Sequence, residues 1–227
     1  MKKTAFITEP RKHKALKFVL ENFLSILPEE WNIQINHSTE NINYIKQVIN
    51  NSEIISKADS QSRILLHNLK VKELTHEDES ALSRSIDFWN SIDGDLLLKF
   101  ECDTMLCPNS KHRISDFEKF KYIGGYWGTQ LYSPLDSPYP TLKPGGAYHA
   151  PYKGPQVLPM NGALSIRDKQ TMIDTITEFH TGYISPLNGE APFGVHKPWA
   201  DKGGAYKDIK IACKEVEILE SLQQIED

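Results

Sequence analysis

Two acidic residues follow an apolar run near the middle of the chain. The stretch LLLKF, residues 96–100, leads directly into Glu101 and Asp103, with Cys102 between them. A short apolar run that is bounded by turn residues is typical of a buried strand. Carboxylates at the carboxyl end of an inner strand lie where open α/β sheets bind their ligands. The two acids therefore indicate either a ligand site or an ordinary strand exit.

The segments around this run alternate between strand and helix patterns. Residues 10–27 predict a helix, because Leu16, Leu20 and Phe23 recur at helical spacing and Pro28 stops the run. Thr75 followed by Asp78 is a capping-box start to a later helix. The expected strands are 4–9, 31–38, 63–71 and 96–105, and the other expected helices are 39–52, 75–94, one opened by Ser115 and Glu118, and 213–225.

This order of elements predicts an α/β sheet that binds a nucleotide at its carboxyl edge. The usual phosphate-binding motifs are absent from the sequence. No G-x-G-x-x-G follows the first expected strand, and no Walker lysine motif occurs. The dinucleotide-binding and P-loop classes are therefore excluded.

The bulk composition fits one globular domain in a reducing compartment. The 227 residues carry no obvious linker, and 39% hydrophobic with 25% charged residues is typical of a folded chain. The net charge of −4 gives no basic field for nucleic acid or an anionic membrane. No apolar run approaches the roughly 20 residues of a membrane span, and the start MKKTAFITEP is too short in apolar residues for a signal peptide. Three cysteines cannot all pair and favour a cytoplasmic location.

Two irregular stretches interrupt the second half of the chain. Residues 128–159 are dense in Pro, Gly and Tyr and predict a functional or a disordered loop. The tyrosines and the preceding Trp127 favour packing or ligand stacking. A strand and a helix are expected over 161–179, before the second irregular stretch at 180–204.

Several segments together resemble an uncharacterised domain family that is classed among the glycosyltransferases, with members in large DNA viruses, fungi, algae and bacteria. The resemblance runs from about Thr4 to Trp199, and if the protein is viral it implies the host cytoplasm. The segments are EPRKHKALKFVLENF, SIDFWNSI, FECDTMLCPNS, ISDFEKFKYIGGYW, NGALSIRDK and GVHKPW.

The resemblance implies a divergent GT-A-like fold, which is α/β with a mixed central sheet flanked by helices. In that fold a D-x-D-type motif holds a divalent metal against the diphosphate of a sugar nucleotide. Asp103 matches the acid of the family motif, whereas Glu101 stands where glutamine is expected. Glutamate keeps an oxygen ligand, so Mn²⁺ or Mg²⁺ is the expected cofactor.

The segment GVHKPW is similar to the C-terminal histidine and Lys-Pro-Trp element of glycogenin-type transferases. By that likeness His196 is a third metal ligand and Lys197 contacts the diphosphate, although a lone histidine is more often structural. Glu9 and Arg11 lie where such folds receive the base and ribose, and Arg11 has an alternative role in a surface salt bridge. Trp127 either stacks on a sugar or base or packs the loop onto the core.

The segment NGALSIR resembles a family segment that lines the acceptor and sugar side of the pocket. Asn161 and Gly162 fit the pattern, but Ala163 replaces a glycine and can crowd a close backbone approach. Arg167 is either a sugar or phosphate contact or a surface residue before the helix. An acidic stretch expected after this segment is shortened, which leaves Glu190 as the candidate catalytic base.

The sequence therefore predicts one GT-A-like domain over 1–227. Residues 1–107 form the nucleotide-binding half, 108–199 the acceptor-side half with its Pro- and Tyr-rich loop, and 200–227 a C-terminal helix. The expected activity moves a sugar from a nucleoside-diphosphate sugar to a hydroxyl acceptor. The alternatives are a degenerate, non-catalytic module that binds a sugar nucleotide or glycan, and a metal-dependent nucleotidyl or phosphoryl transferase.

Overall fold

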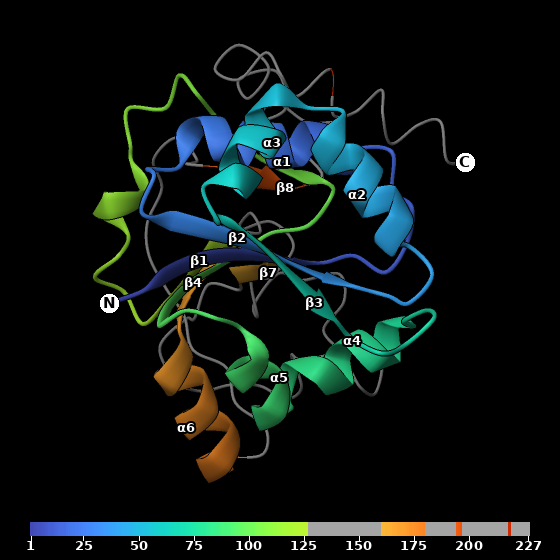
Figure 1. Cartoon of the computed structure of the whole chain (residues 1–227). Helices are drawn as coiled ribbons and strands as arrows, with labels where there is room; N and C mark the ends of the chain where they lie inside the picture. The colour runs from blue at the N-terminus through green and yellow to red at the C-terminus, as the bar shows by residue number, and fades with distance from the viewer. Residues whose placement is uncertain (127–159, 180–193, 197–217, 219–227) are drawn as a thin grey trace, which may run out of the picture.

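A mixed six-stranded sheet runs through the centre of the protein (Figure 1). The computed structural model describes residues 1–126, 160–179, 194–196 and 218. The strand order is β3-β2-β1-β4-β7-β6; the first four strands are parallel, β7 is antiparallel to β4, and β6 is antiparallel to β7. The strands are β1 (Lys3–Thr8), β2 (Trp31–His37), β3 (Ile64–Asn68), β4 (Leu96–Lys99), β6 (Tyr122–Tyr126) and β7 (Met160–Asp168).

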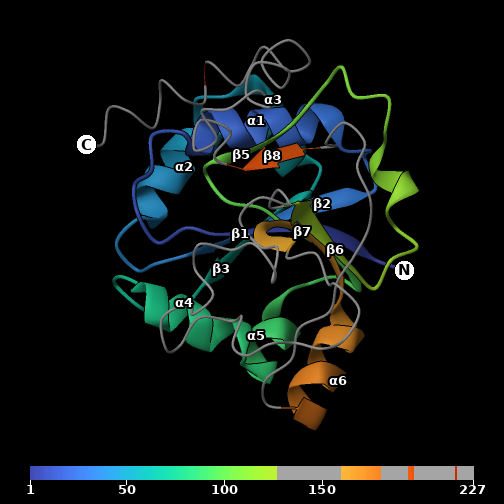
Figure 2. The ribbon, with the colours of Figure 1, turned by 180° about the vertical axis from the view of Figure 1, so that it is seen from behind.

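Helices cover both faces of this sheet, which gives three layers (Figures 1 and 2). One face carries α1 (Leu16–Ile26), α2 (Ile42–Asn50) and α3 (Glu53–Ser60); the other carries α4 (His76–Ser83), α5 (Ile86–Ser91) and α6 (Lys169–Phe179). The expected class, α/β with a mixed central sheet flanked by helices, is confirmed. Since β4 and β7 pair, the two expected halves of the chain share one sheet, and their separate roles stay predictions. No helix in the described ranges is long and apolar enough to span a membrane.

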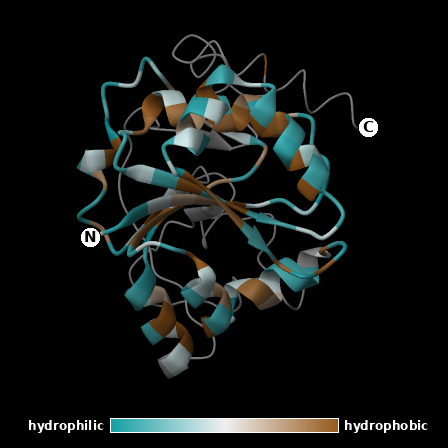
Figure 3. Cartoon of the chain, viewed as in Figure 1, coloured by the Kyte–Doolittle hydropathy of each residue, from teal (hydrophilic) through white to brown (hydrophobic). Residues whose placement is uncertain are grey.

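Apolar side chains fill the space on each side of the sheet (Figure 3). The larger core lies under α1, where Phe23 stacks on Phe100 with ring centroids 4.1 Å apart. The smaller core joins Phe6 to Phe88 and Trp89 through edge-to-face ring contacts. The helical spacing that predicted α1 is confirmed, because its repeating apolar residues are all buried.

The helix α1 begins at Leu16 and not at the expected residue 10. Tertiary hydrogen bonds hold the preceding segment in a non-helical path. The Asn41 side chain donates to the carbonyl oxygens of Glu9 and Arg11, both at 2.8 Å. The Tyr44 hydroxyl donates to the carbonyl oxygen of His13 at 2.7 Å. These bonds use backbone acceptors that a longer helix would have turned inward, so the prediction for residues 10–15 was wrong.

The strand expected over 96–105 is also divided. β4 ends at Lys99, and β5 (Thr104–Leu106) leaves the main sheet to pair with β8 (Gly194–His196) in a two-stranded antiparallel sheet. A tight turn causes the break: Thr104 Oγ1 donates to the carbonyl oxygen of Glu101 at 2.7 Å and accepts from its N–H at 3.1 Å. The side chain of Asn22 on α1 then accepts from the N–H of Leu106 and donates to its carbonyl oxygen, at 2.7 and 2.9 Å.

Capping explains the remaining differences among the helices. The Thr75–Asp78 capping box is confirmed, but the expected helix over 75–94 divides into α4 and α5 because Ser85 caps a new start. α3 follows Ser52 as an unexpected helix, also with a side-chain cap. The helix expected at Ser115 is only a 3₁₀ turn, Ile114–Asp116. The expected helix over 213–225 lies outside the described residues apart from Ile218.

Candidate functional site

The turn between β4 and β5 presents the two acids at the carboxyl edge of the parallel strands. Cys102 is buried inside the turn, while Glu101 and Asp103 are half-buried. The Oδ1 atom of Asp103 is inaccessible to solvent. Glu101 accepts a hydrogen bond from Lys99 Nζ at 2.7 Å, which neutralises part of its charge. The turn can therefore offer carboxylate oxygens to a ligand, with Lys99 as a competitor at Glu101.

Glu9 and Arg11 form an ion pair beside this turn. The Glu9 side chain is 4% exposed and the Arg11 side chain 68% exposed. Arg11 donates from Nε to Glu9 Oε1 at 2.8 Å and from Nη2 to Oε2 at 2.9 Å, and its backbone N–H also donates to Oε1. Both expected site residues are thus brought together. Glu9 holds the guanidinium of Arg11 at the edge of the sheet, so Arg11 is the one of the pair that faces solvent.

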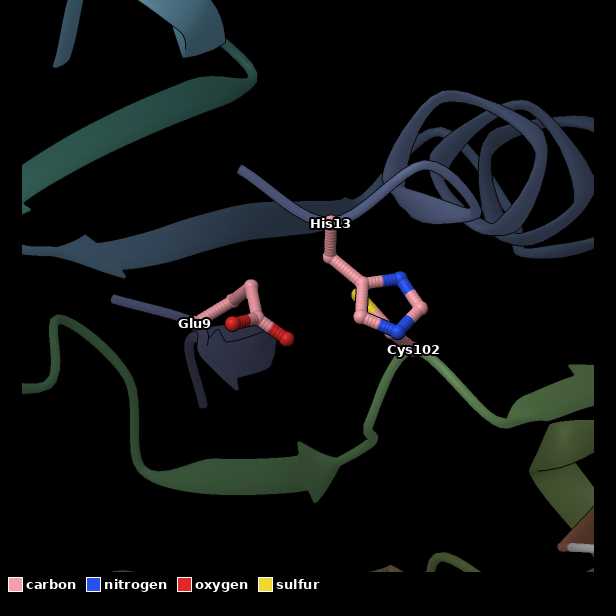
Figure 4. A group of neighbouring side chains, drawn as sticks. All are labelled: Glu9, His13 and Cys102. Atoms are coloured by element: carbon pink, nitrogen blue, oxygen red, sulfur yellow. The ribbon is translucent and has the colours of Figure 1, made fainter. Parts of the chain in front are cut away.

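A buried group of possible metal ligands lies next to this ion pair (Figure 4). Within the described ranges, Glu9, His13 and Cys102 are a group whose ligand atoms all lie within 4.8 Å of one another. Each of the three residues is at most 4% exposed. Burial raises the pKa of the Cys102 thiol well above its usual range, and the charge of Glu9 and a hydrogen bond to it act in the same direction.

Sequence reasoning missed this group because it weighed cysteine spacing alone. Glu9 and His13 are four residues apart, and only the fold brings Cys102 to them. A glutamate and a histidine at that spacing, just after the first strand, are the signal that was available. A further acid was missed on α4. The pKa of Glu79 is raised by desolvation and then by the charge of Glu101, so α4 brings another carboxylate toward this edge.

The pairing of β5 with β8 joins the acidic turn to the GVHKPW segment. His196 lies opposite Thr104 in the register, and Thr104 directly follows Asp103. This pairing concerns the backbone, since the side chain of His196 lies outside the described part of the chain. Lys197, Trp127 and Glu190 also lie outside it, so their expected roles stay predictions.

The NGALSIR segment lies in β7, on the other side of β4. The pairing with β6 jumps from Ser165 opposite Gly124 to Asn161 opposite Gly125, so the residues between them form an irregular bulge. Asn161 is described only by its backbone. Gly162 and Ala163 lie within the bulge, and Ala163 is 6% exposed.

Arg167 braces this bulge. Its Nη2 donates to the carbonyl oxygen of Gly162 at 3.1 Å, and its Nε donates to Ser165 Oγ at 2.9 Å. Its guanidinium lies over the rings of Trp89 and Tyr122, at 5.4 and 5.2 Å from their centroids. Burial lowers the pKa of Arg167, while Tyr122 and Glu101 oppose that shift, which places its charge near the acidic turn. These contacts favour a supporting role over a freely exposed surface position.

The fold and this edge define an α/β protein with polar and acidic residues gathered at the carboxyl ends of its parallel strands. The chain belongs to the family described as "Protein of unknown function (DUF5672)", whose model matches residues 63–192. No curated protein matches the chain.

Solved structures with a similar arrangement include three with glycosyltransferase or related titles. They are S. aureus TarS 1-349 in complex with UDP-GlcNAc (TM-score 0.45, 11% identity, 77% of this chain and 47% of that one), the glycosyltransferase GlyE of Streptococcus pneumoniae TIGR4 (0.41, 8%, 79% and 40%) and the mannosyltransferase PcManGT from Pyrobaculum calidifontis in complex with GDP-Man and Mn²⁺ (0.38, 7%, 55% and 35%). The chain spans less than half the length of each of these structures.

Proposed function

We propose that the protein is a metal-dependent glycosyltransferase that moves a sugar from a nucleoside-diphosphate sugar to a hydroxyl acceptor. The sequence resemblance motivates this proposal, and one structural observation carries it. The two segments that the resemblance assigns to metal binding are far apart in the sequence, yet β5 and β8 pair so that His196 lies opposite Thr104, beside Asp103.

The donor chemistry of the acidic turn fits the expected cation. Glu101 and Asp103 offer carboxylate oxygens, which are the ligands that Mn²⁺ and Mg²⁺ prefer. When bound, such a cation offsets the negative charge that builds on a departing nucleoside diphosphate. Glu101 has to exchange its bond with Lys99 to act as a ligand. Asp103 is therefore the acid on which the proposal mainly depends.

The other residues of the edge have roles in binding the donor and acceptor. The guanidinium of Arg11, oriented by Glu9, would contact the ribose or a phosphate through bonds that a planar cation forms well. Lys197 would contact the diphosphate. Arg167 would act through the bulge, by fixing Asn161 and Gly162 on the acceptor side. Trp127 would stack on the sugar or base, and Glu190 would accept the proton of the acceptor hydroxyl.

Release of the nucleoside diphosphate tests this proposal. The assay screens UDP- and GDP-sugars with and without Mn²⁺, on the wild type, Asp103→Asn and the control Asp59→Asn, which makes the same change at an exposed acid of α3. Metal-dependent release that is lost only in Asp103→Asn is the expected result. Failure of every donor to bind or react, with or without metal, would mean that the acids are only a strand exit.

A second candidate function is a module that binds a sugar nucleotide without turnover. The bond between Lys99 and Glu101 and the buried Ala163 favour it, because both alter positions that the family pattern assigns to ligands. The same variants distinguish the two functions. A binder would show donor binding that needs Mn²⁺ and Asp103, measured by calorimetry, but no release of UDP or GDP from any donor.

A further inference from the structure

We propose that Glu9, His13 and Cys102 form a separate site for a thiophilic divalent cation such as Zn²⁺, inside the protein and next to the acidic turn. This site does not depend on the proposed glycosyltransferase activity. Its ligand atoms are a carboxylate oxygen, an imidazole nitrogen and a cysteine sulfur, all within 4.8 Å of one another. Figure 4 shows the three side chains around one shared space.

Three separate parts of the fold supply the ligands. Glu9 directly follows β1, His13 lies in the non-helical segment before α1, and Cys102 lies in the turn after β4. Bonds of about 2.0–2.3 Å to a tetrahedral zinc ion hold such donors about 3.5 Å apart. The donors therefore need to approach one another by roughly 1 Å, which the side chains can do by small rotations. Because the segments meet only in the folded protein, a cation there stabilises the native state.

The charges of the group suit a divalent ion. When the cation binds, the Cys102 thiol loses its proton to solvent and its sulfur takes the metal instead of donating to Glu9. The thiolate and the Glu9 carboxylate then carry two negative charges, which the cation balances. Glu9 keeps its bonds from Arg11, because a carboxylate has about four lone-pair positions for donors and metal together.

His13 needs one rearrangement to bind through Nε2. Its Nδ1 accepts a hydrogen bond from the Ala15 N–H at 3.2 Å, so Nε2 carries the ring proton in the metal-free protein. Binding at Nε2 moves that proton to Nδ1 and replaces this long bond with a metal bond. The ring stays neutral, and the thiol proton is the only one released.

The ligand set distinguishes this site from the acidic turn. Thiolate and imidazole select zinc-like ions, whereas Mn²⁺ and Mg²⁺ prefer sites made of oxygen atoms. Cys102 nevertheless lies between Glu101 and Asp103 in the sequence. A cation on Cys102 would therefore hold the backbone of the turn that carries both acids, and would act on them as a structural support.

Cobalt binding to the full chain tests the site. After treatment with a chelator, Co²⁺ is added and thiolate-to-cobalt charge transfer is followed by near-ultraviolet absorbance. We expect one Co²⁺ per chain, displaced by Zn²⁺. The charge-transfer band disappears in Cys102→Ser and persists in Cys107→Ser, which alters another buried cysteine of the same core. His13→Gln keeps the band but weakens binding by at least tenfold, since changes beyond the direct ligands already cost about that much.

The outcomes separate this site from the proposed catalytic one. Asp103→Asn should keep the cobalt band, even where it abolishes Mn²⁺-dependent release of UDP or GDP. If Cys102→Ser does not fold, as judged by circular dichroism, the affinity of His13→Gln decides the question. The absence of a band in the wild type, its loss in Cys107→Ser, or unchanged affinity in His13→Gln would overturn the proposal.

Discussion

Asn22 offers the sharpest test of how the acidic turn is held. Its side-chain amide forms two hydrogen bonds to Leu106, accepting from the N–H at 2.7 Å and donating to the carbonyl oxygen at 2.9 Å. Asn22→Leu keeps a similar side-chain volume but removes both bonds. Each lost bond leaves a backbone group without this partner, at a cost of about 1–3 kcal/mol when the group is buried. Since these bonds are only partly buried, we expect a total loss of about 2–3 kcal/mol.

Urea unfolding measures this loss as a shift of the midpoint at an unchanged m-value. The control is Ser25→Ala on the same helix, where an exposed hydroxyl donates to the Glu21 carbonyl oxygen and the expected change is within about 0.5 kcal/mol. Asn22→Asp adds a finer test. Its carboxylate can still accept from Leu106 but opposes the carbonyl oxygen, so its defect should shrink below pH about 4, where the acid is protonated. Equal stability of Asn22→Leu and Ser25→Ala would refute the bracing role.

Three further changes address the core, the bulge and the acid limb of stability. Phe100→Ala removes a fully buried ring and should cost about 3–5 kcal/mol in the same unfolding assay; a loss below 1 kcal/mol would contradict the packing. Gly162→Ala places a methyl carbon 2.9 Å from Arg167 Nη2 and should cost about 1–3 kcal/mol, a penalty that Arg167→Ala should largely remove if the clash is real. Burial acts to raise the pKa of Asp168, but hydrogen bonds from Lys121 and the first turn of α6 lower it overall. Its stabilisation is therefore complete above the unfolded pKa of about 3.9 and is lost as the pH falls through the lower folded value. Asp168→Asn should flatten unfolding curves measured over that acid range, and an unchanged pH profile would rule the contribution out.

The fold was predictable where local patterns and tertiary packing agree. The spacing of Leu16, Leu20 and Phe23 indicated α1, and the Thr75–Asp78 pair indicated the start of α4. Both signals lie within one turn or a few turns of helix, so they do not depend on distant residues. The order of strands and helices then led to the α/β class with its mixed sheet.

The candidate site was predictable only in part, because distant contacts shape it. The acids at Glu101 and Asp103 were visible as a strand end, but the turn that separates β4 from β5 depends on Thr104 and on Asn22 from α1. Sequence patterns do not reveal that a side chain from one helix replaces a strand neighbour. The grouping of Glu9 with Cys102 was hidden for the same reason, since it follows from the pairing of β1 with β4.

The pairing of β5 with β8 also has a consequence for the order of folding. β5 and the parallel strands are synthesised well before residues 194–196, so the small sheet forms only by a contact of high sequence separation. Such contacts slow folding, because the chain between them has to be closed into a loop. Until β8 arrives, the backbone edge of β5 that it will cover is open to other extended chains, as edge strands generally are. A nascent chain released before that point would therefore tend to aggregate through the same segment that carries the acidic turn.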